Sequence, residues 1–201
     1  GVFPFSEDVP QYTYDVEQAQ ALLAESGVDP SEISLRITYA AENAVQEVIA
    51  PLLKDAWEEA LGIEITIEAI LFNQQWDEAK SDPANAQDVF LLLYWPTYSD
   101  AGADNLWSMF RSSEFPFFNL SYWANEDFDA LIDEAGTVSG TDLDAARDLY
   151  TEAQTIMVEE APGLFFMDVG AWYAVPTYIT GFEYNLNYPF SINFYNLEIA
   201  S

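Results

Sequence analysis

The sequence of 201 residues contains no cysteine and no histidine, and only five of its residues are lysine or arginine. Without cysteine and histidine the chain has no thiol nucleophile, no disulfide, no imidazole base and no zinc site of the common kinds. Nucleic acid is disfavoured as a partner, because phosphate binding requires clustered basic side chains and these five are scattered. The same scarcity disfavours anionic lipid surfaces.

Long apolar runs are also missing. No stretch reaches the length needed to span a bilayer, and the N-terminal residues 1–5 have neither the signal-peptide nor the lipid-attachment pattern. We therefore expect the targeting region of an exported parent protein to lie outside this chain.

Acidic residues dominate the charged positions. The chain has 35 Asp and Glu residues and a formal net charge of -30, while half of its residues are apolar and 16% are aromatic. This composition predicts a folded body with an acidic surface, because a disordered acidic tail carries few aromatics. Molar salt shortens the screening length to roughly 3 Å and relieves the repulsion within such a surface. The composition favours a salt-loving source; a moderately acidic mesophilic protein is the alternative.

Residues 1–94 predict an alternation of helices and strands. Residues 1–13 form an extended lead-in that packs against another part of the protein. The apolar periodicity then predicts a helix over 15–27, a half-buried strand over 33–39, a helix over 43–62 that Pro51 kinks or restarts, a strand over 63–67, a short helix over 73–80 and a strand covered on both faces over 89–94. This order is typical of a layered α/β domain.

The second half predicts a long loop region over 95–123 with one helix near 104–110. Long irregular segments in compact domains are usually functional. Two helices follow, one carrying Phe128 and Ile132 and a longer one from Thr141 to Pro162. Beyond them the pattern predicts strands over 164–167 and 172–175 and an extended tail over 181–201.

Aromatic and polar side chains crowd the region after the strand over 89–94. Open α/β sheets bind ligands at the carboxyl ends of their strands, and flat rings beside hydroxyl, amide and carboxylate groups suit an amphipathic solute such as a sugar or a peptide. The alternative is that most of these rings fill the core. The candidate ligand-binding residues are Trp95, Thr97, Tyr98, Asp100, Trp107, Phe118 and Asn119.

The paired carboxylates of the sequence are weak candidates for catalysis. Asp127, Asp129, Asp133 and Glu134 lie on a predicted helix whose opposite face is apolar, so we expect them on a solvated surface. An acidic hydrolase domain using two carboxylates stays open as an alternative function. Residues 119–121 match the glycosylation pattern Asn-x-Ser, a weak signal at a loop position.

Five segments in order resemble the second lobe of the family 5 extracellular solute-binding proteins, of the oligopeptide- and dipeptide-binding type. Residues 14–27 match the opening Tyr-Asp-x-x-x-Ala-x-x-Leu-Leu-x-x-x-Gly. The resemblance continues through 61–65, 119–132, 150–162 and 194–197. It covers nearly the whole chain.

The resemblance implies a binding lobe and not an enzyme. The expected fold is α/β, a periplasmic-binding-protein-like lobe over 1–201 with a mixed, mostly parallel sheet flanked by helices. The tail over 181–201 would return toward a first lobe that is missing here. The implied function is to hold a small solute, a peptide or an oligosaccharide, between two lobes and deliver it to an ABC permease, with no cofactor and no metal. The parent would be a monomeric, extracellular, haloarchaeal lipoprotein, anchored through a segment absent from this chain.

The resemblance also assigns a role to the end of the central strand. In the family's peptide binders a Trp there lines the ligand cleft, and an Asp shortly after it holds the peptide's amino terminus. Trp95 matches that Trp, but Thr97 stands where the Asp would fall. A neutral Thr forms no charge-assisted bond to an ammonium group. A sugar or another neutral solute is therefore as plausible as a peptide, unless Asp100 takes the role of the Asp.

Overall fold

The computed structural model of the chain describes residues 2–92, 102–114, 118–167, 172–185 and 191–200. These residues form two compact units. The sheet unit comprises Gln11–Tyr94 and Glu114–Tyr122, and the helical unit comprises Gly1–Pro10, Trp95–Ser113 and Trp123–Ser201. The prediction of a single lobe over 1–201 stays a prediction.

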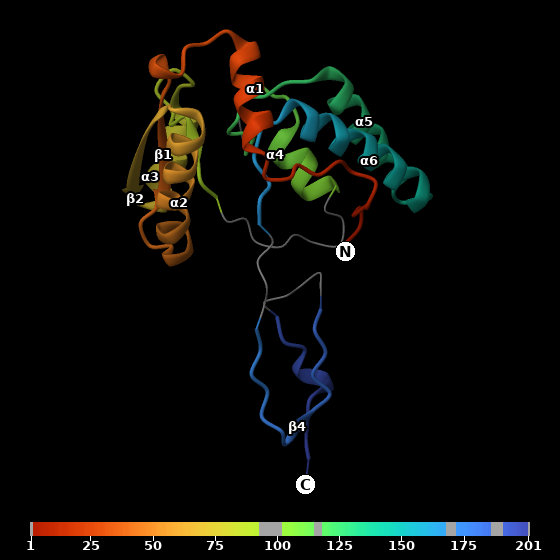
Figure 1. Ribbon diagram of the computed structural model, residues 1–201. Coiled ribbons are helices and arrows are strands. Elements are labelled where there is room, and N and C mark those ends of the chain that lie inside the picture. Colours follow the sequence, from red (N-terminus) through yellow and green to blue (C-terminus); the bar gives the residue numbers. More distant parts are fainter. Residues whose placement is uncertain (1, 93–101, 115–117, 168–171, 186–190, 201) are drawn as a thin grey trace. The chain divides into compact units, whose positions relative to one another are not determined.

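The sheet unit contains a three-stranded parallel sheet with the order β2-β1-β3 (Figure 1). Its strands are β1 (Ser34–Ala40), β2 (Glu64–Ile70) and the short β3 (Val89–Phe90). They alternate with α1 (Val16–Ser26), the short 3₁₀ helix η1 (Pro30–Glu32), α2 (Ala44–Leu61) and α3 (Phe72–Ser81). The predicted alternation of helices and strands is confirmed.

The helices of this unit begin and end where their caps predict. The Asp15 carboxylate accepts a hydrogen bond from the Gln18 amide, and Gly27 ends α1 in a left-handed conformation with φ 72°. Asn43 caps α2, which continues unbroken through Pro51 to Leu61. The expected restart at Pro51 is therefore wrong.

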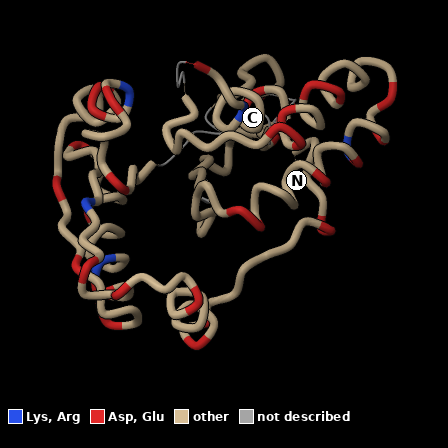
Figure 2. Tube along the Cα trace, turned by 90° about the horizontal axis from the view of Figure 1, so that it is seen from above, with Lys and Arg blue, Asp and Glu red and all other residues tan. Residues whose placement is uncertain are grey.

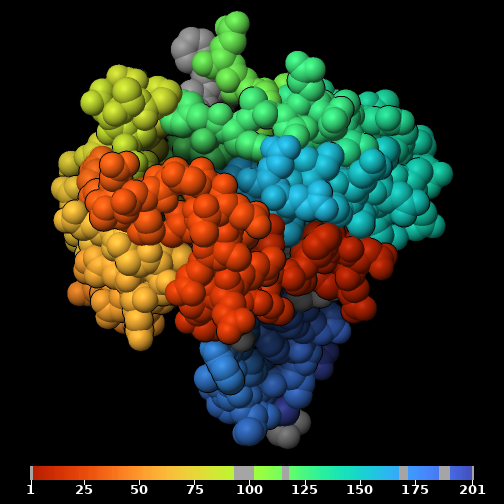
Figure 3. All heavy atoms as spheres, turned by 45° about the horizontal axis from the view of Figure 1, so that its top comes forward, coloured from red at the N-terminus to blue at the C-terminus, as the bar shows by residue number. Residues whose placement is uncertain are grey.

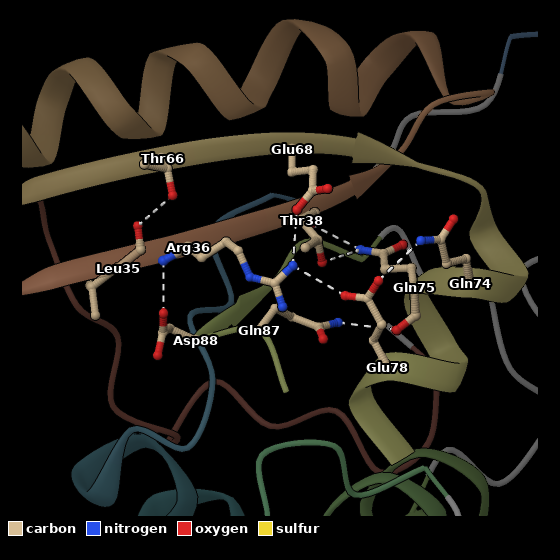
Figure 4. Close-up of polar contacts among 10 residues, drawn as sticks. All are labelled: Leu35, Arg36, Thr38, Thr66, Glu68, Gln74, Gln75, Glu78, Gln87 and Asp88. Atoms are coloured by element: carbon tan, nitrogen blue, oxygen red, sulfur yellow. Dashed lines mark hydrogen bonds and ion pairs between the residues drawn. The ribbon is translucent and has the colours of Figure 1, made fainter. Parts of the chain in front are cut away.

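Both faces of the central strand β1 are covered. Ile37 packs with Ala50 and Ile65 on one side of the sheet, and each of these side chains is at most 1% exposed. On the other side Thr38 is also fully buried, because the Gln75 side chain of α3 lies over it (Figure 4). The expectation of a half-buried strand is wrong, since α3 returns across the polar face.

The predicted apolar faces of α1 and α2 are only partly buried. No residue of α1 is buried and Leu22 is 56% exposed. In Figure 3 the orange-red segment that includes α1 lies at the surface of the face in view. On α2 the side chains of Val45, Val48 and Leu52 are exposed, whereas Ala50 packs into the core.

The core of the helical unit lies between α5 (Glu126–Val138) and α6 (Leu143–Glu160), which run side by side (Figure 1). Alanines at positions 135, 146 and 153 are fully buried and allow the two helices to approach closely. Phe3 packs edge-on against the Tyr150 ring at 5.9 Å between centroids, so the predicted packing of the lead-in is confirmed for Phe3. The π-helical segment η2 (Gly102–Trp107) and the short α4 (Ser108–Phe110) form the helix expected near 104–110.

The C-terminal part of this unit has less regular structure than predicted. Residues 164–167 and 172–175 form no strand, so both strand predictions are wrong; apolar side chains alone do not make a strand without a partner to pair with. Instead β4 (Ile179–Thr180) pairs antiparallel with β5 (Glu198–Ile199), and a 3₁₀ turn η3 (Phe194–Asn196) precedes β5. We call residues 172–185 and 191–200 the C-terminal arm.

A close contact between η2 and α6 gives a first prediction. A methyl group added at Gly102 would meet the Tyr150 ring carbons at 2.3–2.5 Å. We expect Gly102→Ala to destabilise the chain by about 1–3 kcal/mol through overpacking, measured by thermal unfolding in molar salt. Gly136→Ala on α5 is the matched control, because nothing lies within 4 Å of the added methyl and helical Ala is favoured over Gly. Equal stability of the two variants would contradict the prediction.

Candidate ligand-binding site

The carboxyl end of β3 leads toward the predicted ligand-binding residues. Leu91 follows β3, is 5% exposed, and donates its amide hydrogen to the Thr38 carbonyl of β1 at 3.0 Å. The chain then continues to Trp95, Thr97, Tyr98 and Asp100, and these four residues lie outside the described part of the chain. Their predicted roles stay predictions.

Trp107, the fifth predicted residue, ends η2 in the helical unit. Its side chain is 51% exposed, and its indole Nε1 donates to Asp133 Oδ1 at 3.2 Å. The Arg111 guanidinium lies 5.7 Å from the ring centroid, within the range of a cation–π contact. Trp107 thus presents an exposed aromatic surface whose orientation is fixed by two neighbours, a property suited to stacking against a ligand.

The carboxylate that holds Trp107 is also bound by Arg111 through two hydrogen bonds. Nε donates to Oδ1 of Asp133 at 2.9 Å and Nη2 donates to Oδ2 at 2.7 Å. These bonds lower the pKa of Asp133 below its ordinary value. Asp129 accepts from the Ser112 amide at 3.0 Å. Asp127, Asp133 and Glu134 are exposed, as expected for a solvated acidic face, and Asp129 is partly buried. Asp129 and Asp133 also tie α5 to the segment that follows α4.

Phe118 and Asn119, the last two predicted residues, lie in the sheet unit. Phe118 is 42% exposed, contacts the Trp76 ring edge-on at 5.6 Å, and has the Lys80 ammonium 5.0 Å from its centroid. Asn119 is only 4% exposed, and its Oδ1 accepts from the Ser121 hydroxyl at 2.9 Å. Asn119 is therefore almost fully covered in this structure, whereas Phe118 exposes part of its ring.

Sequence reasoning missed the aromatic cluster around Trp76 on α3. The Trp76 ring contacts Phe72 at 5.8 Å and Phe90 at 5.2 Å in addition to Phe118. The spacing of Phe72 and Trp76, four residues apart on one helix, is the signal that would have found the first of these contacts. Three buried glutamines, Gln46, Gln75 and Gln87, were also missed, and no sequence pattern distinguishes them from surface glutamines.

The seven predicted residues are therefore divided. Phe118 and Asn119 belong to the sheet unit, Trp107 belongs to the helical unit, and the other four lie outside the described residues. Among the described residues no group of three or more Asp and Glu side chains is placed to hold a metal ion. No helix in the described ranges combines the length and apolarity required to cross a bilayer.

Solved structures show which class of protein this fold defines. The structure of OppA from Burkholderia pseudomallei matches all of this chain with a TM-score of 0.73, at 21% sequence identity and over 39% of its own length. Parallel strands flanked by helices, matched along the whole chain, define a periplasmic-binding-protein-like α/β fold.

A family model narrows the class. The model described as bacterial extracellular solute-binding proteins, family 5 middle, matches residues 1–117, and the chain belongs to this family. The dipeptide-binding protein of Escherichia coli is 24% identical over 165 residues, and the heme-binding protein A of Haemophilus influenzae is likewise 24% identical over 165 residues. Each alignment covers 80% of this chain but only 29% of the relative, so the chain spans less than a third of either protein.

Proposed function

We propose that this chain is the second, ligand-binding lobe of a two-lobed extracellular solute-binding protein that delivers a peptide or another small solute to an ABC permease. The family membership supports binding and transport and offers no support for an enzymatic role. The ligand would lie at the carboxyl ends of the parallel strands, which is where open α/β sheets bind their ligands.

The C-terminal arm provides the main support for a partner lobe. None of its described residues is buried, and Trp172 and Tyr195 are 96% and 95% exposed. A two-stranded ribbon without a buried face is marginally stable in water at best. Residues 172–200 also contain only two acidic residues, Glu183 and Glu198, in a chain where 35 of 201 residues are acidic. The C-terminal arm thus has an exposed aromatic surface with few acidic side chains, unlike the rest of the chain. We infer that another part of a longer polypeptide covers this surface.

The ligand class follows from the residues after β3. Trp95 supplies an aromatic face, but neutral Thr97 replaces the carboxylate that would pair with a peptide's ammonium group. We propose a small amphipathic solute, a peptide or an oligosaccharide, that stacks on Trp95. The carbohydrate alternative gains weight if Asp100 does not reach the ligand. We further propose a high-salt, haloarchaeal source and a membrane-anchored lipoprotein parent, on the acidic composition and the family membership.

Replacing Trp95 tests this placement. In the complete two-lobed protein, Trp95→Ala should weaken ligand binding by roughly 1–3 kcal/mol, because a stacking face at the ligand is lost. Stability should fall by less than the roughly 3–5 kcal/mol that deletion of a buried Trp costs. Calorimetry with ligands selected from a pool of short peptides and neutral sugars measures the first, and thermal unfolding the second.

The matched control is Tyr14→Ala, which removes an aromatic side chain that is 87% exposed and lies outside the candidate site. It should leave affinity and stability close to those of the wild type. A large loss of stability in Trp95→Ala with unchanged affinity would show that Trp95 is a core residue and not a ligand contact.

A further inference from the structure

The backbone hydrogen bonding between β1 and β3 ends after the bond from the Leu91 amide to the Thr38 carbonyl. Ile37 and Thr38 of β1 lie opposite Val89 and Phe90, and Leu91 still donates its amide hydrogen to the Thr38 carbonyl at 3.0 Å. In a parallel ladder the next bond would run from the Ala40 amide of β1 to the Leu91 carbonyl. That bond does not form in the described structure, although β1 itself continues to Ala40 and stays paired with β2.

Two buried glutamine side chains form hydrogen bonds with the two backbone groups that would make this bond, the Ala40 amide and the Leu91 carbonyl. Gln46 of α2, 2% exposed, accepts the Ala40 amide hydrogen on its Oε1 at 2.8 Å. Gln75 of α3, fully buried, donates from Nε2 to the Leu91 carbonyl at 3.2 Å and to the Thr38 carbonyl at 2.9 Å. The two amides come from two different helices that both follow β1 in the sequence, and each satisfies one half of the missing backbone bond.

The opposite end of the β1–β3 ladder is closed in a similar way. The Arg36 amide of β1 donates to the Asp88 carboxylate at 2.8 Å, immediately before β3 begins (Figure 4). Hydrogen bonds from side chains therefore replace backbone pairing at both ends of this ladder. This explains why β3 spans only two residues. Gln75 is itself held in place, since its backbone carbonyl accepts from Gln87 Nε2 at 3.1 Å (Figure 4).

Buried backbone groups must be paired, so the two glutamines substitute for a backbone bond that would otherwise form. Without the two glutamines, the lowest free energy would be reached if the Ala40 amide donated a hydrogen bond to the Leu91 carbonyl. That bond would extend β3 along β1. Their effect is to end the backbone pairing of the two strands at the carboxyl edge of the sheet. That edge is where open α/β sheets bind their ligands.

We propose that Gln46 and Gln75 are positioning residues for the ligand site: together they end the β1–β3 ladder at the carboxyl edge of the sheet, where open α/β sheets bind their ligands. This inference rests on the proposed ligand-binding function, because Trp95 lies only four residues after Leu91. Neither glutamine contacts the ligand in this proposal.

The test uses the complete protein in molar potassium chloride with the variants Gln46→Met, Gln75→Met and the double variant. Each single variant leaves one buried backbone group unpaired and should lower the midpoint of thermal unfolding. The double variant frees both groups to bond to each other, so its midpoint should fall by less than the sum of the single effects. Hydrogen exchange of the Ala40 amide should be fast in Gln46→Met and slow again in the double variant.

Ligand binding separates positioning from stability. Probed with a pool of di- to pentapeptides and neutral sugars, and then with the ligand that the pool identifies, the double variant should bind at least about tenfold more weakly than the wild type despite its recovered stability. Gln74→Met is the matched control: Gln74 precedes Gln75 on α3, lies exposed and bonds only to Glu78 in the described structure. It should leave affinity, exchange and unfolding unchanged.

The outcomes distinguish the two proposals. A wild-type protein that binds a solute, with a double variant that binds it equally well, overturns the positioning role alone. If the double variant loses as much stability as the two single variants together, and its Ala40 amide still exchanges fast, the glutamines do not replace a backbone hydrogen bond. If the wild-type protein binds none of the peptides and sugars in the pool, both the proposed function and the positioning role are overturned.

Discussion

Lowering potassium chloride from molar concentration to about 0.1 M should lower the midpoint of thermal unfolding of this chain by more than about 10 °C. Figure 2 shows acidic residues along nearly every segment and basic residues at few places. In the described structure the ion pairs join Arg36 to Glu68 and Glu78, Lys54 to Glu58, Arg111 to Asp133, and Arg147 to Asp144. All are partly exposed and contribute little to stability.

The expected size of the effect follows from screening. Two carboxylates about 10 Å apart in water repel by about 0.4 kcal/mol before screening. Salt at 0.1 M reduces this to roughly a third, and molar salt to a few per cent. Roughly thirty such pairs then contribute about 4 kcal/mol of repulsion at low salt and well under about 1 kcal/mol at high salt. The unfolded chain spreads the same charges over a larger volume, and a native domain is stable by only about 5–15 kcal/mol.

A charge variant controls for salting-out of apolar surface, which also strengthens with salt. Glu25, Glu59, Glu134 and Glu152 are exposed, and their side chains make no hydrogen bond or ion pair within the described residues. Replacing all four with Gln should raise the unfolding midpoint at 0.1 M and flatten its dependence on salt. Circular dichroism during heating measures both. A midpoint that does not change between molar and 0.1 M salt would rule out the high-salt interpretation.

The sequence predicted the helices and strands of the sheet unit well, because their signals are local. Asp15, Gly27, Asn43 and Gly62 bound α1 and α2 by capping hydrogen bonds and left-handed backbone, which depend on the residue itself. The parallel sheet followed from the order of the elements. At Pro51 the structure excludes the predicted restart, because a continuous helix tolerates the loss of one backbone bond, and the predicted kink stays a prediction.

Features that depend on distant partners were not predictable. Thr38 reads as a polar, solvent-facing residue until α3 is known to place Gln75 over it. The early end of β3 is set by Gln46 and Gln75, which lie 45 and 16 residues away from Leu91 in the sequence. Residues 172–175 have strand-forming composition but pair with no other strand among the described residues. Periodicity reports which face is apolar, and tertiary contacts decide whether a neighbour covers it.

The isolated chain should fold in molar salt yet bind no peptide or sugar detectably by calorimetry, whereas the complete protein binds one of them. Two-lobed binding proteins close around their ligand by a hinge motion, so each lobe supplies only part of the contacts. The proposed stacking of the ligand on Trp95 leaves the opposite side of the ligand in water. Closure against a first lobe would both complete the contacts and exclude that water.

The magnitude makes this a sharp test. A typical micromolar complex is stable by roughly 8 kcal/mol, and half of the contacts leaves only a few kcal/mol, at or beyond the millimolar range. The affinity of the isolated chain should therefore be at least about a thousandfold weaker than that of the complete protein. Near-ultraviolet circular dichroism in the same buffer checks that the isolated chain is folded, with Gly136→Ala as a stabilised version if it is marginal. Micromolar binding by the folded, isolated chain would mean that these 201 residues hold a complete site, and the two-lobed proposal would have to be abandoned.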